Sequence, residues 1–214
     1  VSKKEGKVGP RRIDAMLDAM PHRGPNDRGV FTEGSSSLGH LRLSILDLSS
    51  DGKQPMHDEH NELTIVFNGE VFNYVELREE VRGLGHVFHT QTDTEVILAA
   101  YREWGSACVA RFNGMWAFAI LDRRTGAVFA SRDRFGVKPF FYRETKGEIL
   151  FASEMKAILA AANEKPAMNG AFLYQYLDRA VPADPSETVF AGVRSLLPGH
   201  NLFIEQGSLR TVRY

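Results

Sequence analysis

The tripeptide Asn68-Gly69-Glu70 combines residue types that can stabilise a negatively charged oxygen. It ends a stretch in which the apolar residues Leu63, Ile65 and Phe67 alternate with other residues, the pattern of a half-buried strand. Glycine at such a point lets the backbone turn or approach a ligand closely. A backbone N–H beside an asparagine amide supplies the two donors of an oxyanion hole. On the tripeptide alone, a simple strand-ending turn is the alternative interpretation.

Two charged residues suggest a second function, the binding of an ionic ligand. Arg42 lies inside a predicted strand in which Leu41, Leu43 and Ile45 alternate with other residues. Its planar guanidinium suits a carboxylate, although it could also be an outward-facing strand residue. Asp93 opens a predicted helix, where its carboxylate could bind a cation or only complement the helix dipole.

The elements that position these residues are predicted from periodicity and cap signals. One helix is expected from Arg12 to Met20, and four others are expected to begin at the caps Asn73, Thr92, Ser153 and Asn169. Hairpins are expected in the second half of the chain, where MWAFAILD pairs with AVFASRD, FFYRE with EILFAS, and HNLFIE with SLRTVRY. This order lacks a regular βαβ series. It predicts an α+β domain of antiparallel sheets covered by helices.

Composition excludes several classes of function. The 214 residues are 43% hydrophobic and 25% charged, which is typical of a globular domain. A net charge of -1 favours neither nucleic acid nor an acidic membrane surface as a partner. The longest apolar run, Met115 to Leu121, is far short of the roughly 20 residues of a membrane-spanning helix. With Cys108 as the single cysteine, no intramolecular disulfide can form, and we expect a cytoplasmic protein.

Motifs for common cofactors are missing. The sequence contains neither a phosphate-binding loop nor a dinucleotide-binding fingerprint. The pairs His57 with His60 and His86 with His89 have spacings seen in metal sites, but ordinary polar loops explain them better. We therefore expect neither a metal nor a cofactor in this domain.

Nine segments in chain order resemble one known family: HRGPNDRG from His22, HLRLSILDLS from His40, GKQPM from Gly52, FNGEVFNY from Phe67, TDTEV from Thr92, RFNGMWAFAILD from Arg111, SRDRFGVKPFFY from Ser131, FASEMKAI from Phe151 and LLPGH from Leu196. They resemble the class II glutamine amidotransferases, most closely the glutaminase domain of the asparagine-synthetase branch. The resemblance implies an N-terminal-nucleophile hydrolase fold, a four-layer αββα sandwich of antiparallel sheets.

The resemblance also implies how free glutamine is bound. Arg42 would hold the α-carboxylate, and Asp93 with Glu70 would hold the α-ammonium. Main-chain groups around Leu43 and Ile45 would complete the pocket. Asn68 and the Gly69 N–H would form the oxyanion hole. These pairings are chemically reasonable because a free amino acid presents one anion and one cation. Each charge-assisted hydrogen bond would contribute about 1.5–3 kcal/mol.

The nucleophile of the family does not occur in the sequence. Members begin Met-Cys-Gly-Ile and attack with the cysteine thiol, whose own α-amino group acts as the base. Here the first residue is Val1, and Cys108 is expected to be a buried structural thiol. We expect that the sequence starts inside the first strand, about five or six residues late. Natural loss of the nucleophile is the other explanation. Either way, these 214 residues are predicted to be inactive.

Residues 1–214 are thus predicted to form one glutaminase domain. In this family the product ammonia is used by a C-terminal synthetase domain, which would require ATP and Mg and is absent from the sequence. The expected partners are glutamine, that synthetase domain and, by family habit, a second copy in a homodimer, with no nucleic acid and no membrane. A glutamine-binding or scaffolding domain without a nucleophile, on the same fold, is the alternative function.

Overall fold

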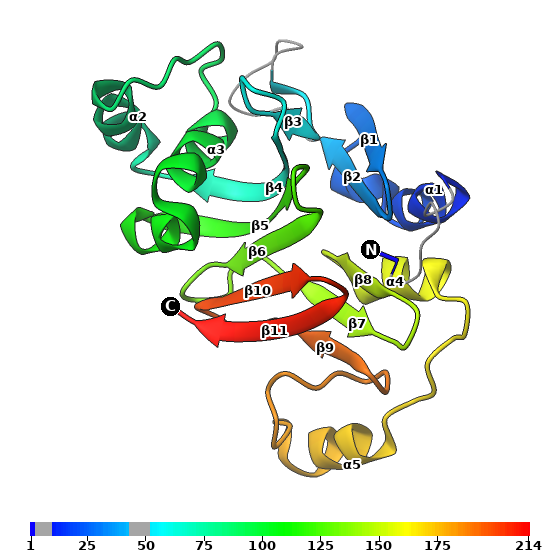
Figure 1. Cartoon of the computed structure of the whole chain (residues 1–214). Helices are drawn as coiled ribbons and strands as arrows, with labels where there is room; N and C mark the ends of the chain where they lie inside the picture. The colour runs from blue at the N-terminus through cyan, green and yellow to red at the C-terminus, as the bar shows by residue number, and fades with distance from the viewer. Residues whose placement is uncertain (3–9, 43–51) are drawn as a thin grey trace.

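The computed structural model of the chain describes residues 1–2, 10–42 and 52–214 (Figure 1). The α-helices are α1 (Pro10–Asp18), α2 (Tyr74–Gly83), α3 (Asp93–Trp104), α4 (Met155–Ala161) and α5 (Gly170–Arg179). Two 3-10 helices are η1 (Pro21–Arg23) and η3 (Gly105–Arg111). The strands are β1 (Asp27–Glu33), β2 (Ser36–Arg42), β3 (Met56–His57), β4 (Leu63–Val71), β5 (Gly114–Asp122), β6 (Ala127–Arg132), β7 (Phe141–Glu144), β8 (Ile149–Ala152), β9 (Val193–Ser195), β10 (His200–Glu205) and β11 (Ser208–Arg213).

All pairings between these strands are antiparallel. A six-stranded sheet has the order β11-β10-β6-β5-β4-β3, a three-stranded sheet has the order β8-β7-β9, and β1 and β2 form a separate hairpin. The three hairpins predicted in the second half of the chain are confirmed as β5–β6, β7–β8 and β10–β11.

Three buried apolar clusters show how the elements are layered. The first joins α2 and α3 to one face of the six-stranded sheet, and the second joins the other face to β2, β7 and β8. The third packs α1 and α4 against β8 and β9. Figure 1 shows the helix pairs α2–α3 and α1–α4 on opposite sides of the strands. The predicted α+β class with αββα layers is confirmed.

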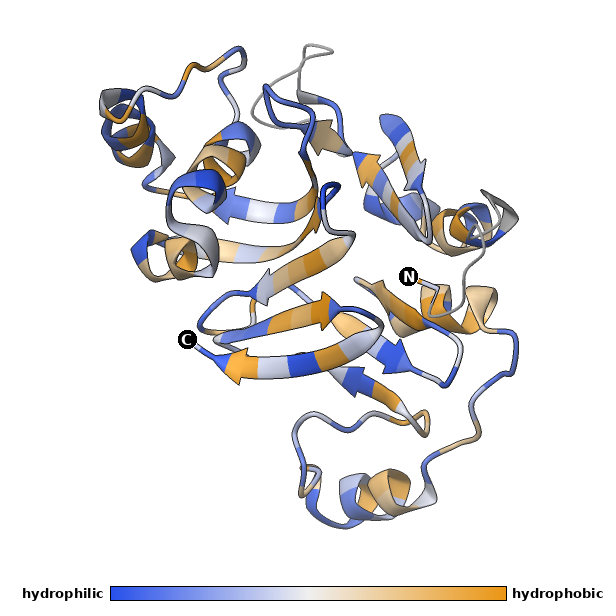
Figure 2. Cartoon of the chain, viewed as in Figure 1, coloured by the Kyte–Doolittle hydropathy of each residue, from blue (hydrophilic) through white to orange (hydrophobic). Residues whose placement is uncertain are grey.

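Strand β5 shows how the sequence produces these layers. Its side chains alternate between the two faces of the sheet, as the pleat of a strand requires. Trp116, Phe118 and Ile120 belong to the helix-side cluster, whereas Ala117 and Ala119 belong to the cluster between the sheets. Both faces are covered, which explains the continuous apolar run. Hydrophobic residues also colour much of β6, β8 and α4 (Figure 2).

Two of the four predicted helix caps need correction. Asn73 precedes α2, but its side chain makes no cap hydrogen bond; it accepts from the Asn113 N–H (2.8 Å) and donates to Arg111 O (3.0 Å) instead. The N-cap of α4 is Glu154, one residue after the predicted Ser153. The caps Thr92 and Asn169 are confirmed, because each accepts a bond from the backbone N–H three residues later.

The hairpin β1–β2 was not predicted from the sequence, where the strand was expected only around Leu41, Leu43 and Ile45. The strand β2 instead begins at Ser36, and Gly34 lies in the turn with φ +55°. Leu43 and Ile45, the other two residues of the predicted strand, lie outside the described residues.

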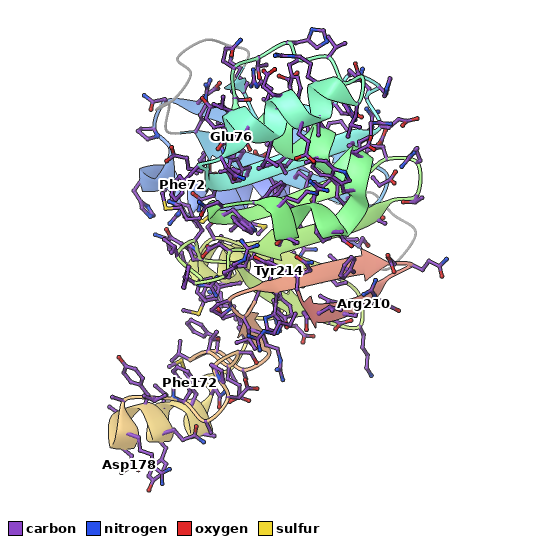
Figure 3. The ribbon with its side chains drawn as sticks, turned by 90° about the vertical axis from the view of Figure 1, so that its left-hand side faces the viewer. Phe72, Glu76, Phe172, Asp178, Arg210 and Tyr214 are labelled. Atoms are coloured by element: carbon purple, nitrogen blue, oxygen red, sulfur yellow. The ribbon has the colours of Figure 1, made fainter. Side chains whose placement is uncertain are left out.

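Helix α5 differs from the other α-helices in its surroundings. It has no buried residue, and Figure 3 shows it projecting from the rest of the molecule, with Phe172 and Asp178 labelled. Within the described ranges, no helix has the length and apolar composition needed to cross a membrane.

Candidate functional site

One edge of β4 carries a row of polar groups beyond the point where β3 ends. The Phe67 N–H donates to Gln54 Oε1 (2.6 Å), and the Val71 N–H donates to Asp93 Oδ2 (3.0 Å). Residues 67, 69 and 71 direct their N–H groups to the same side of a strand because the backbone alternates with a period of two. The Gly69 N–H is therefore directed to this edge, between Gln54 and Asp93.

Gly69 cannot be replaced by a larger residue without moving the backbone. Its φ is +155°, which L side chains rarely adopt. A β-carbon there would lie 2.1 Å from the carbonyl oxygen of Met115 on the paired strand β5. Its direct partner in the register is the fully buried Trp116, whose indole N–H donates to Ser131 Oγ (3.1 Å). The element that approaches this glycine closely is β5, whereas the predicted approach to a ligand stays a prediction.

Arg42 is the last residue of β2. Side chains alternate between the two faces of a strand, and this alternation determines the face on which Arg42 lies. Leu38 belongs to the cluster between the sheets, whereas Leu41 packs with α1 in the third cluster. Residues 38, 40 and 42 share a face, so Arg42 faces the six-stranded sheet and is not an outward-facing residue. Its guanidinium lies against Gly52, where a β-carbon would be 2.4 Å from Nη2.

Asp93 and Glu70 bring two carboxylates to the same region. Asp93 is 4% exposed at the first position of α3. Burial raises the pKa of Asp93 above its ordinary value, hydrogen bonds from backbone N–H groups oppose this shift, and the nearby Glu70 carboxylate adds to it. A buried carboxylate with a second carboxylate beside it is stabilised by a cation.

A cavity of about 150 Å³ lies next to this edge, between β2, β4, β5, β8 and α1. Asn68 and His40 both line it. The His40 Nε2 contacts Phe67 O at 3.1 Å. His40 Nδ1 and Asn68 Nδ2 are buried and have no hydrogen-bond partner in the described part of the chain. Val1 also lines the cavity, and its carbonyl accepts from the Ile149 N–H of β8 (2.8 Å).

The structure places five of the predicted site residues around the β4 edge: Arg42, Asn68, Gly69, Glu70 and Asp93. The predicted Leu43 and Ile45 lie outside the described residues. His40, Gly52 and Gln54 were not singled out from the sequence. The signal for His40 was present, since a residue two positions before Arg42 on a strand shares its face.

Cys108 does not take part in this site. It is fully buried in the helix-side cluster, as expected for a structural thiol. Burial raises the pKa of Cys108 to about 12, so the thiolate does not form near neutral pH. This cysteine therefore cannot act as a nucleophile in the folded chain.

The chemistry of the site follows from its charges and donors. One guanidinium and two carboxylates can bind a molecule that carries both an anion and a cation. An asparagine amide and a backbone N–H next to them can bind a carbonyl oxygen or a developing oxyanion.

Comparison with known proteins adds independent information. A profile of the glutamine amidotransferase domain matches residues 2–214. The glutamine-hydrolysing asparagine synthetase 3 of Bacillus subtilis is 39% identical over 204 residues, which cover 94% of this chain and 33% of that protein. A putative glutamine-hydrolysing asparagine synthetase 2 of Methanocaldococcus jannaschii is 46% identical over 177 residues, which cover 73% of this chain and 34% of that protein. The chain spans about a third of the length of these curated relatives.

A solved structure of phosphoribosylpyrophosphate amidotransferase from B. subtilis is similar in fold. It superposes with a TM-score of 0.70 at 18% identity and covers 98% of this chain and 47% of that chain. A structure described as the allosteric regulatory enzyme of purine biosynthesis gives a TM-score of 0.72, also at 18% identity. At this identity the likeness concerns the fold alone.

Proposed function

The chain belongs to the glutamine amidotransferase domain family, with the N-terminal-nucleophile hydrolase fold, and we propose that its site binds free glutamine for hydrolysis to glutamate and ammonia. In this proposal Arg42 binds the α-carboxylate, and Asp93 with Glu70 binds the α-ammonium. Asn68 and the Gly69 N–H hold the side-chain carbonyl. Main-chain groups around Leu43 and Ile45 complete the pocket.

One observation supports this proposal most: Asp93 accepts a hydrogen bond at the β4 edge to which the Gly69 N–H is directed, and Arg42 lies against Gly52, beside Thr92. Arg42 reaches the site from β2, Asp93 from α3, and the donors Asn68 and Gly69 come from β4, which lies between them in sequence. Because three separate elements supply the groups, the fold must be complete before the ligand can bind. A free amino acid with a carboxamide side chain matches this order of charges and donors.

We further propose that the 214 residues bind glutamine without hydrolysing it. Hydrolysis in this family needs a thiol, and the only thiol among these residues is the buried Cys108. The cavity beside Asn68 extends between β2 and β8, where Val1 already pairs with Ile149. A thiol carried on a strand that continues this pairing would enter the cavity next to the donor pair.

The fate of the ammonia is proposed from the relatives. Their names describe glutamine-hydrolysing asparagine synthetases, and this chain spans about a third of their length. We propose that the ammonia is passed to an ATP- and Mg-dependent, amide-forming domain of a longer polypeptide, with a homodimer as the assembly. The acceptor carboxylate, aspartate or another, would be selected by that second domain.

Titration calorimetry with L-glutamine tests the binding site directly. The Arg42→Ala and Asp93→Asn variants should each weaken binding at least about tenfold, the loss of one charge-assisted hydrogen bond. Arg28→Ala is the matched control, because Arg28 pairs with Asp14 and Asp18 at the surface. Equal affinities in all four proteins would refute the pocket assignment.

An ammonia-release assay separates this function from the alternative, a nucleophile-free binding or scaffolding domain. A longer polypeptide that carries Met-Cys-Gly-Ile on a strand ahead of Val1 should release ammonia from glutamine, and the same polypeptide with serine replacing that cysteine should not. If both bind glutamine and neither releases ammonia, the scaffolding function is the correct one.

A further inference from the structure

The hydrogen-bonding state of His40 follows from its partner. Its Nε2 lies 3.1 Å from the carbonyl oxygen of Phe67, and a carbonyl can only accept. Nε2 therefore carries the hydrogen. In a neutral imidazole the other nitrogen, Nδ1, is then an acceptor with a free lone pair.

His40 is neutral near pH 7. Burial lowers the pKa of His40 to about 4, and the nearby Arg42 charge lowers it as well. The hydrogen bond with Phe67 and the Asp27 charge act in the opposite direction and are outweighed. The acceptor character of Nδ1 is therefore maintained under ordinary conditions.

Two unsatisfied groups of opposite kind line the same cavity. His40 Nδ1 is an acceptor without a donor, and Asn68 Nδ2 is a donor without an acceptor, within the residues that the structure describes. Buried polar atoms are nearly always paired in folded proteins. Two other unpaired atoms, Arg78 Nε and Asn201 Oδ1, do not line this cavity, so the complementary pair inside it points to a ligand. A carboxamide is the complementary group, because it offers one acceptor oxygen and one donor NH2.

We propose that His40 is the residue that distinguishes glutamine from glutamate, by accepting a hydrogen bond at Nδ1 from the side-chain NH2 of glutamine while Asn68 donates to its carbonyl oxygen. This inference rests on the proposed function. The geometry supports it, because His40 and Arg42 lie on one face of β2, roughly 6.6 Å apart along the strand. An extended five-carbon amino acid can bridge that distance between its two ends.

The selectivity has a simple electrostatic origin. The carboxylate of glutamate has only acceptor oxygens, so one of them would face the Nδ1 lone pair with no hydrogen between them. Sites built to bind a donor reject an analogue that lacks it, because their own polar group is then left unpaired. The same contact would favour release of glutamate after hydrolysis.

The test uses two substitutions of His40, each of which keeps one of the two hydrogen bonds assigned to the imidazole. His40→Gln keeps a donor for Phe67 O but has no acceptor at the Nδ1 position, whereas His40→Asn keeps an acceptor near that position. Titration calorimetry at pH 7.5 measures the Kd of L-glutamine and L-glutamate for the wild-type chain and both variants. Thermal unfolding of each protein checks that it is folded.

The wild type should prefer glutamine at least tenfold. In His40→Gln the preference should fall below about threefold, through weaker glutamine binding, and His40→Asn should retain most of it. If the wild type binds glutamine but His40→Gln discriminates equally well, the role of His40 is refuted and the proposed function stands. If the folded wild type binds no glutamine at millimolar concentration, the proposed function itself fails, and this inference with it.

Discussion

A β-carbon on Gly52 would lie 2.4 Å from Nη2 of Arg42, so the guanidinium occupies the space that any other residue at position 52 would fill. The same β-carbon would lie 3.4 Å from Cγ2 of Thr92, the residue before Asp93. Gly52 thus lies between the positive and the negative part of the proposed amino-acid site. Its missing side chain determines where the guanidinium can rest.

Gly52→Ala should therefore weaken glutamine binding about tenfold, the equivalent of one misplaced charge-assisted hydrogen bond. The far end of the Arg42 side chain can move, so the free energy of unfolding should change by less than about 1 kcal/mol. Gly83→Ala is the matched control, because a β-carbon there meets no atom within 4 Å. Calorimetry and urea unfolding of both variants measure the two effects; equal glutamine affinities would contradict the prediction.

Gly69→Ala should behave differently, because its β-carbon would meet backbone and not a mobile side chain. We expect a loss of at least about 3 kcal/mol in the free energy of unfolding, from the steric overlap with Met115 O and the strained φ. Urea unfolding provides the measurement. A variant as stable as wild type would show that β4 and β5 do not approach as described.

Asp93→Asn should separate stability from binding. Burial raises the pKa of Asp93 in the folded chain, so the ionised carboxylate lowers the free energy of unfolding at a pH above that pKa. This loss disappears as the pH falls below 3.8, the ordinary pKa of an aspartate. An asparagine can still accept from the Val71 N–H. The variant should be at least as stable as wild type at pH 7, with an advantage that shrinks toward pH 3, although it binds glutamine more weakly. Thermal unfolding across this pH range tests the sign.

Glu154 should show the opposite dependence on pH. Burial acts to raise its pKa, but hydrogen bonds from His22, Lys156 and Arg23 outweigh this and lower the pKa of Glu154 to about 2. The ionised Glu154 adds to the free energy of unfolding above pH 4.5, the ordinary pKa of a glutamate. This contribution is lost as the pH falls through about 2. Glu154→Gln should lose about 1 kcal/mol at pH 7, since solvent screens these pairs. The difference in unfolding temperature between the two proteins should shrink below pH 4.5 and disappear as the pH falls through about 2.

Cys108 should be unreactive in the folded protein. Its side chain is fully buried and its pKa is raised to about 12 by that burial, so an aromatic disulfide reagent should label it only after unfolding. Cys108→Ser should leave glutamine affinity unchanged but lower stability, because it places a hydroxyl in an apolar cluster. Rapid labelling of the native chain would contradict the assignment of this cysteine as structural.

The sequence predicted those parts of the fold whose signals are local. The capping residue Thr92 and the turn between β5 and β6 depend on neighbours in the chain, and both were predicted correctly. The β1–β2 hairpin was missed because its strands are only partly buried and its turn at Gly34 stands in a polar run. Asn73 was expected to cap α2, but its tertiary contact with the 111–113 segment replaced the local bond.

Residue pattern singled out Asn68-Gly69-Glu70, Arg42 and Asp93 as candidates, and the family resemblance supplied the role of each. Arg42 and Asp93 each had an ordinary alternative interpretation. The structure shows that Asp93 bonds to the β4 edge and that Arg42 lies against Gly52, beside Thr92. The spacing of His40 from Arg42 placed both on one strand face, but the unpaired nitrogen of His40 and the space beside Gly52 could not be read from the sequence. Both properties exist only in the folded chain.

Trp116 stands directly across the β4–β5 ladder from Gly69, with its indole fully buried and bonded to Ser131. Tyr214 stacks on the same indole, at 6.3 Å between ring centroids. A charged ligand bound beside residues 68–70 should therefore change the electric field at the buried Trp116 indole. With Trp104 replaced by phenylalanine, the emission spectrum of Trp116 would offer a reagent-free way to follow occupancy of the site in real time.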